Sequence, residues 1–101
     1  MVLVMTQAVS LASHVRIPEG ILFHPLQNEL VLLNLDTGVY CGLDPVGTRI
    51  WQLMQAHPTR SLQQIVDALV REYDVDKKRC VRDLLALVAR LEEKKLIEIS
   101  T

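Results

Sequence analysis

VYCGLDPVGTRIW, residues 39–51, decides the fold because it changes from the pattern of a strand to that of a helix. Side chains of a strand alternate between two faces, so the apolar residues at every second position share one face. The two faces are Val39, Cys41 and Leu43 on one side, and Tyr40 and Gly42 on the other. We therefore expect a strand over Val39–Leu43 with one face against a core.

A helix start follows this strand directly. Asp44 is a good N-cap, and Pro45 suits the first helical position, where its missing N–H costs nothing. Apolar side chains then recur at helical spacing and give the helix one buried side. These side chains belong to Ile50, Trp51, Leu53 and Met54. The sequence therefore predicts a helix over residues 45–56 that packs against a small sheet.

Further strands precede residue 39. Residues 21–26 and 29–35 have strand patterns, and Gln27-Asn28 suits a tight hairpin turn between them. A weaker alternation over residues 14–17 indicates a short additional strand. Apolar residues occupy both faces of 29–35, which is typical of a central strand. Asp36-Thr37-Gly38 is the next turn, so the sheet is predicted to be a meander with residues 39–43 at its edge.

Two more helices are predicted downstream. Ser61 and Gln64 form a capping-box pattern, so a helix should run from Leu62 to Tyr73. Asp76 is positioned to cap a third helix, from about Lys77 to Lys95, and residues 96–99 should be extended. The fold class is therefore α+β, a small antiparallel three-stranded sheet packed on three α-helices in a winged helix-turn-helix-like arrangement. We expect a flexible N-terminal tail over 1–12 and one domain over 13–101.

Composition limits the possible functions. The chain has 101 residues, half of them apolar, which suits one globular domain. Its net charge of −1 provides no basic surface for nucleic acid or an anionic membrane. No apolar run approaches the roughly 20 residues that span a bilayer. Cys41 and Cys80 form no CxxC pair and the histidines are scattered, so we expect free thiols, no metal, no cofactor and a cytoplasmic location.

The third helix is a first candidate for function. Its apolar arc covers roughly 200°, which is wider than the stripe a surface helix needs. Cys80, Leu84, Leu87, Val88 and Leu91 form the main apolar face, and Val81, Leu85 and Ala89 extend it along one flank. Either the fold covers this flank or the flank lines a groove for a partner. Lys78 and Arg82 border it, as a solvated face or as contacts for an acidic partner.

The edge strand Val39–Leu43 is a second candidate. It is short and has no Pro or Lys, the residues that discourage pairing of an edge strand with another chain. Its unpaired N–H and C=O groups could therefore accept a peptide as an added strand. Alternatively, the N-terminal tail shields the edge. The same edge could also pair two copies of the chain, which makes a homodimer possible.

DNA binding and catalysis are two alternative classes of function. A winged-helix DNA-binding protein would use the basic start of the third helix, Lys77, Lys78, Arg79 and Arg82. Acidic residues at 74, 76 and 83 interrupt that basic cluster, which argues against DNA binding. An enzyme would need a nucleophile with a nearby base, or a glycine-rich phosphate loop, and the sequence shows neither, so no catalytic residues are predicted.

The order and spacing of several motifs resemble the PqqD family over about residues 13–99. The motifs are LLNLDTGVY at 32–40, GLD at 42–44 and VGTRIW at 46–51, with Ser61-Leu62, Asp83-Leu84 and Leu96-Ile97 further on. The resemblance implies a winged-helix-like domain without catalytic activity. It also implies that the domain binds the leader segment of a ribosomally made precursor peptide, by strand addition to the last sheet strand and against the third helix.

Carried onto this chain, the resemblance implies a set of peptide-binding residues. These are Val39, Tyr40, Cys41, Gly42 and Leu43 of the strand, with Lys78, Val81, Arg82 and Leu85 of the helix. The Asp-Thr-Gly turn and the Tyr-x-Gly-Leu-Asp run resemble the stand-alone members of lasso peptide pathways more than those of pyrroloquinoline quinone assembly. The implied partners are a precursor leader peptide and a separate leader peptidase or modifying enzyme, with no nucleic acid and no membrane.

Overall fold

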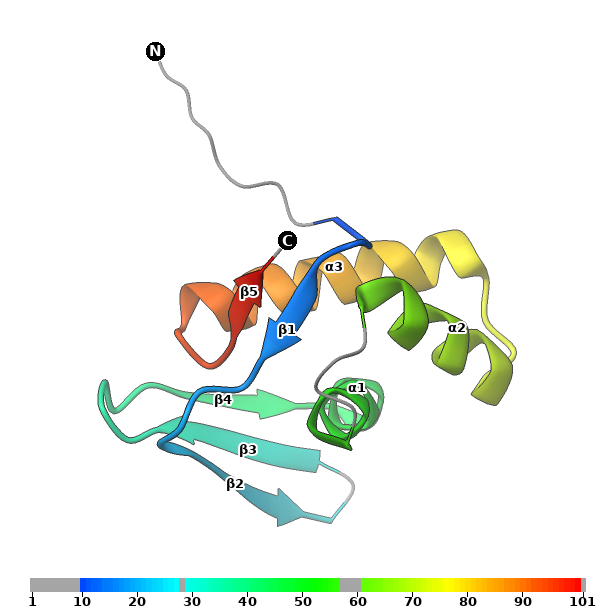
Figure 1. The fold of residues 1–101 in the computed structure, drawn as a ribbon. Coiled ribbons are helices and arrows are strands. Elements are labelled where there is room, and N and C mark those ends of the chain that lie inside the picture. The colour runs from blue at the N-terminus through cyan, green and yellow to red at the C-terminus, as the bar shows by residue number, and fades with distance from the viewer. Residues whose placement is uncertain (1–9, 28, 57–60, 101) are drawn as a thin grey trace.

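The computed structural model describes residues 10–27, 29–56 and 61–100 as an α+β domain (Figure 1). Its strands are β1 (His14–Arg16), β2 (Ile21–Leu26), β3 (Glu29–Asn34), β4 (Tyr40–Leu43) and β5 (Glu98–Ser100). Its helices are α1 (Pro45–Ala56), α2 (Leu62–Glu72) and α3 (Lys77–Glu93). The predicted fold class, a small antiparallel sheet with three helices, is confirmed. No helix in these three ranges is long and apolar enough to cross a membrane.

The main sheet is an antiparallel meander in the order β2-β3-β4, as predicted. β3 is the central strand, and its Leu32 lies opposite Phe23 on one side and Cys41 on the other. β4 begins at Tyr40, one residue later than expected. Val39 precedes the strand, although its C=O already accepts from the Asn34 N–H at 2.9 Å. The predicted hairpin residue 28 lies outside the described residues.

A second, two-stranded sheet joins the two ends of the described chain. β1 and β5 pair antiparallel with Val15 opposite Ile99, a pairing that the sequence did not reveal. This pairing brings the preceding residues against the start of α2, where the Leu11 C=O accepts from the Gln63 N–H at 2.9 Å. Residues 10–12, expected to belong to the tail, are therefore folded against α2. The rest of that expected tail, residues 1–9, lies outside the described residues.

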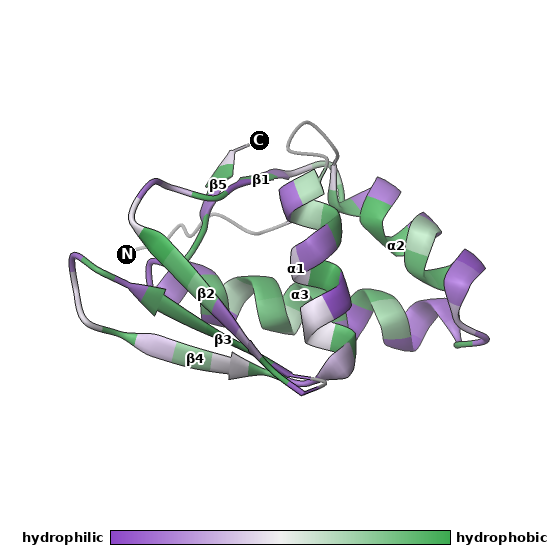
Figure 2. Cartoon of the chain, turned by 90° about the horizontal axis from the view of Figure 1, so that it is seen from below, coloured by the Kyte–Doolittle hydropathy of each residue, from purple (hydrophilic) through white to green (hydrophobic). Residues whose placement is uncertain are grey.

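The helices begin where their capping residues predicted. The Asp44 carboxylate accepts from the Gly47 N–H at 2.7 Å at the start of α1. Ser61 and Gln64 form the reciprocal capping box of α2, and Asp76 accepts from the backbone N–H of Arg79 at the start of α3. These bonds satisfy N–H groups that have no partner inside the helix. Figure 2 shows hydrophilic residues gathered where α2 connects to α3.

The core lies between the main sheet and the helices. Trp51 is its largest side chain and is only 1% exposed. The other fully buried large side chains are Leu32, Leu43, Leu62, Ile65, Val66, Leu69, Leu84, Val88, Leu91, Leu96 and Ile97. They come from β3, β4, all three helices and the segment before β5, so one continuous core fixes these elements relative to one another.

Asn34 provides a polar link between the sheet and the end of α3. Its side-chain amide donates to the C=O of Lys95 at 2.7 Å, although the two residues are 61 positions apart. Its side-chain oxygen accepts from the backbone N–H groups of Asp36 and Thr37, at 2.8 and 3.2 Å. Asn34 is 7% exposed, so water cannot easily replace these partners. One side chain therefore holds both the β3–β4 turn and the C-terminal end of α3.

Replacing Asn34 tests this link. Asn34→Ala should lower the free energy of unfolding by roughly 2–4 kcal/mol, because it removes three hydrogen bonds of a side chain that is itself buried. Asn34→Asp keeps the acceptor for the turn but cannot donate to Lys95, so it should also destabilise the protein at neutral pH. Urea unfolding curves measure both effects. An Asn34→Ala curve that superimposes on the wild-type curve would contradict the proposed role.

Candidate functional site

Among the described residues, 10–27, 29–56 and 61–100, β4 pairs only with β3, so its other backbone edge, on the side of α3, is free (Figure 1). The N-terminal tail that could shield this edge lies largely outside the described residues. The bond from the Asn34 N–H to the Val39 C=O makes these two residues a hydrogen-bonded pair. Such pairs alternate along an antiparallel ladder, so Cys41 and Leu43 also direct their backbone groups toward β3. The N–H and C=O groups of Tyr40 and Gly42 therefore point away from the sheet, toward the open side.

The two faces of β4 differ in the way the sequence predicted. Cys41 and Leu43 are buried in the core. Tyr40 is 70% exposed on the opposite face, and a Cβ added to Gly42 would meet nothing within 4 Å. An extended peptide could therefore approach the outward backbone groups of Tyr40 and Gly42 without displacing a side chain from β4.

A hollow of about 700 Å³ lies beside the C-terminal half of β4, and we call it the β4 groove. Three elements line it. The lining residues are Gly42, Leu43 and Asp44 from the end of β4, Val46, Gly47 and Ile50 from α1, and Asp83, Ala86, Leu87 and Arg90 from α3. The α3 residues follow the spacing i, i+3, i+4, i+7, so they form one stripe on the helix. The groove therefore combines a free strand edge with a partly apolar helix wall.

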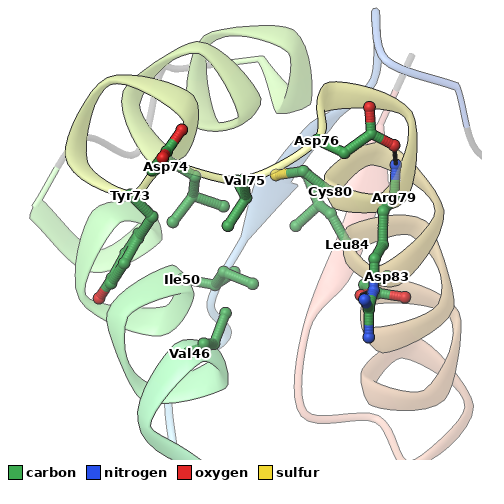
Figure 3. Close-up of a pocket in the computed structure, with 11 residues that line it drawn as sticks. Val46, Ile50, Tyr73, Asp74, Val75, Asp76, Arg79, Cys80, Asp83 and Leu84 are labelled. Atoms are coloured by element: carbon green, nitrogen blue, oxygen red, sulfur yellow. Dashed lines mark hydrogen bonds and ion pairs between the residues drawn. The ribbon is translucent and has the colours of Figure 1, made fainter.

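A second hollow of about 400 Å³ continues the groove toward the connection between α2 and α3, and we call it the side pocket. It shares Val46, Ile50 and Asp83 with the β4 groove. Figure 3 shows Val46 and Ile50 of α1 on one side and Cys80 and Leu84 of α3 across from them. The shared walls place the two hollows next to each other along α3.

Charged and titratable groups lie on the α3 side of these two hollows. Asp83 pairs with Arg79 and with Arg82, each at 3.8 Å, and all three side chains are largely exposed. Burial raises the pKa of the Cys80 thiol, and the negative charge of Asp83 adds to that effect. A thiol with a raised pKa is mostly protonated at neutral pH, so Cys80 is a poor nucleophile.

The structure does not bring the predicted helix residues to the predicted strand. Lys78 and Val81 line a different hollow, together with Asp76 and Lys77. Val81 and Leu85 are half-buried and pack against the core. Neither these residues nor Arg82 are among those that line the β4 groove.

The reason lies in how α3 is rotated in the fold. Leu84, Val88 and Leu91 are completely buried and define the direction in which α3 faces the core. At about 100° per residue, Val81 and Leu85 fall on one side of this line. Asp83 and Leu87 fall on the other side, and this side lines the β4 groove together with Gly42 and Leu43. The sequence shows a helix with two apolar flanks, and tertiary packing selects the one that faces the strand.

Comparisons with known proteins agree with this architecture. The family model for coenzyme PQQ synthesis protein D (PqqD) matches residues 29–97. A comparison with curated proteins finds no significant match. Two solved structures are similar to the chain. The first is TbiB1 in complex with the TbiA(beta) leader peptide, with 40% identity, a TM-score of 0.74, and coverage of 82% of this chain and 94% of that one.

The second is a lasso peptide synthetase B1 complexed with the leader peptide, with 26% identity and a TM-score of 0.73. It covers 84% of this chain and 98% of the other. The resemblance inferred from the motifs is confirmed by both kinds of comparison. Since the family model spans most of the chain and a relative of almost the same extent is 40% identical, the chain belongs to the PqqD family.

Proposed function

We propose that this protein binds the leader segment of a ribosomally synthesised precursor peptide, in the biosynthesis of a lasso peptide. The free edge of β4, facing a groove walled by α3, is the observation that carries the proposal. Both similar solved structures hold a leader peptide. An extended leader would pair with the outward backbone groups of Tyr40 and Gly42 and become the fourth strand of the sheet.

Side chains of the bound leader would alternate between two surroundings. One set would enter the β4 groove and contact Val46, Ile50 and Leu87. The other set would lie on the outer face of the sheet, beside Tyr40. Because the backbone bonds do not depend on leader sequence, affinity comes from the main chain and selectivity from these side-chain contacts.

We propose that the protein acts as an adaptor in the cytoplasm, without catalysis of its own, and that a separate leader peptidase or modifying enzyme takes the peptide from it. The groups around the groove support this role. They are backbone amides, apolar side chains and exposed charges; the Cys80 thiol has a raised pKa, and the Cys41 thiol is buried. Such groups bind and orient a peptide.

Salt dependence separates leader binding from the alternative of DNA binding. Two of the basic side chains at the start of α3, Arg79 and Arg82, already pair with Asp83, which reduces any basic surface there. Titrations with a labelled TbiA(beta) leader and with duplex DNA, at low and high salt, should show saturable leader binding with a shallow salt dependence. DNA affinity that falls steeply with salt, without leader binding, would reverse the assignment.

Substitutions at Gly42 test strand addition. Gly42→Pro should weaken leader binding roughly tenfold or more, because it removes an outward N–H and places a ring where the added strand must lie. Pro is tolerated at outward positions of edge strands, so the fold should persist. Gly42→Ala keeps the N–H and has room for its methyl group, so it should bind like wild type. Fluorescence anisotropy gives the affinities, and equal affinities for both variants would exclude pairing at this edge.

A matched pair of alanines tests which side of α3 is used. Ala86 lines the β4 groove, whereas Ala89 is exposed on the same helix and does not line it. Ala86→Glu should weaken leader binding at least about tenfold, since it fills the groove with a charge that the bound peptide would desolvate. Ala89→Glu should leave binding unchanged while imposing the same change on the helix. The reverse result would favour the flank of Val81 and Leu85.

The Cys80 thiol reports on the side pocket. Its raised pKa should make alkylation slower than that of free cysteine at pH 8, with a rate that increases as the pH rises. Saturating leader peptide should slow the reaction further if the peptide continues past β4 into this pocket. Mass spectrometry measures the rate, and a Cys80→Ser variant shows that the buried Cys41 does not contribute. An unchanged rate would mean that the leader stops short of the side pocket.

A further inference from the structure

The groove wall on α3 carries two opposite charges in a fixed order. Asp83 and Arg90 both line the β4 groove and lie seven residues apart on the same stripe of the helix. With a rise of 1.5 Å per residue, they are separated by about 10 Å along the helix axis. Asp83 also lines the side pocket, so it marks the end of the groove toward the α2–α3 connection, and Arg90 marks the opposite end.

The side chain of Arg90 is available for a ligand. Within residues 10–27, 29–56 and 61–100, the ion pairs involve Arg16, Arg49, Arg79 and Arg82 but not Arg90. A guanidinium offers five N–H donors in a planar array that matches a carboxylate. Its position in the last turn of α3 also favours a positive charge, because it faces the negative end of the helix dipole.

Asp83 forms only weak ion pairs within the protein. Its two arginine partners lie at 3.8 Å, which is near the limit of an ion pair, and its side chain is 64% exposed. Exposed pairs of this kind stabilise a protein very little. A cationic side chain brought into the groove by a peptide can therefore replace them at small cost.

Backbone pairing alone gives little control over the direction of the peptide, since only Tyr40 and Gly42 of β4 offer outward groups. The charges of Asp83 and Arg90 can provide this control over the direction of the peptide. A leader with an acidic residue at the Arg90 end and a basic residue at the Asp83 end gains two favourable contacts. The same leader bound in the opposite direction would meet two repulsions in a groove from which it excludes water.

We propose, on the basis of the proposed function, that Arg90 and Asp83 determine the direction and charge pattern of the bound leader. Arg90 takes an Asp or Glu side chain near the leader residue that pairs with Gly42. Asp83 takes a Lys or Arg side chain closer to the α2–α3 connection. A strand advances about 3.3 Å per residue and directs only every second side chain to the same face, so the two leader charges that enter the groove are an even number of positions apart, about four.

A positional scan of a peptide tests this. The TbiA(beta) leader is synthesised with Glu, Lys or Gln at each position in turn, and each peptide is titrated against wild type, Arg90→Glu, Asp83→Lys and Arg82→Glu. Wild type should prefer Glu over Lys about tenfold at one position, and Lys over Glu at a second position about four residues away, on the same face of the added strand. Arg90→Glu should reverse the first preference and Asp83→Lys the second. Arg82 does not line the groove, so Arg82→Glu should keep the wild-type preference for Glu at the first position. Because Arg82 pairs with Asp83, its replacement by Glu should leave the preference for Lys at the second position intact or increase it.

Three other results of the scan would contradict the proposal, each in a different way. If the Arg90→Glu and Arg82→Glu scans superimpose, Arg90 only stabilises the helix end, and the inference is wrong while leader binding stands. A single reversed position, without the second, would remove Asp83 from the proposal and with it the control of direction. If wild type binds no peptide of the scan, the proposed function itself fails, which is a different result from loss of charge preference.

Discussion

The hydrogen bond from the Asn34 side chain to the Lys95 carbonyl is the constraint on which the groove depends. Asn34 ends β3 and shapes the turn into β4, whereas Lys95 follows the last turn of α3. The bond therefore sets how far the strand edge lies from the helix wall at the end of the groove where Arg90 is found. The hydrophobic core orders both elements, but apolar packing has no preferred direction. The hydrogen bonds of a buried amide do have one, because each needs a partner at a defined position.

Much of the fold follows from local chemistry that is visible in the sequence. Asp44 with Pro45, and Ser61 with Gln64, determine where α1 and α2 begin, because each supplies a partner for helix N–H groups. Gly38 adopts a φ of 75° in the β3–β4 turn, as its turn sequence predicted. The pairing of β1 with β5 could not be predicted, since strands of three residues show too little alternation and their partners lie more than 80 positions apart.

Only one part of the candidate site, the strand edge, could be predicted from the sequence. The free edge of β4 follows from the position of a short last strand that lacks Pro and Lys. The wall of the groove does not follow, because Leu85 and Leu87 look equivalent on a helical projection, and only the rotation of α3 against the core distinguishes them. In the sequence, Asp83 and Arg90 also resemble ordinary solvated charges. Only the structure shows that they lie on one stripe of α3 that borders β4.

The β1–β5 pairing has a consequence for how such a domain can be combined with others. It holds residues near the two ends of the described chain side by side, and none of the groove-lining residues comes from either strand. A covalent connection at that place would leave the groove free. The domain could thus be fused to an enzyme, or inserted into one of its surface loops, without rebuilding the binding edge. The architecture is suited both to a separate subunit and to a segment of a larger polypeptide.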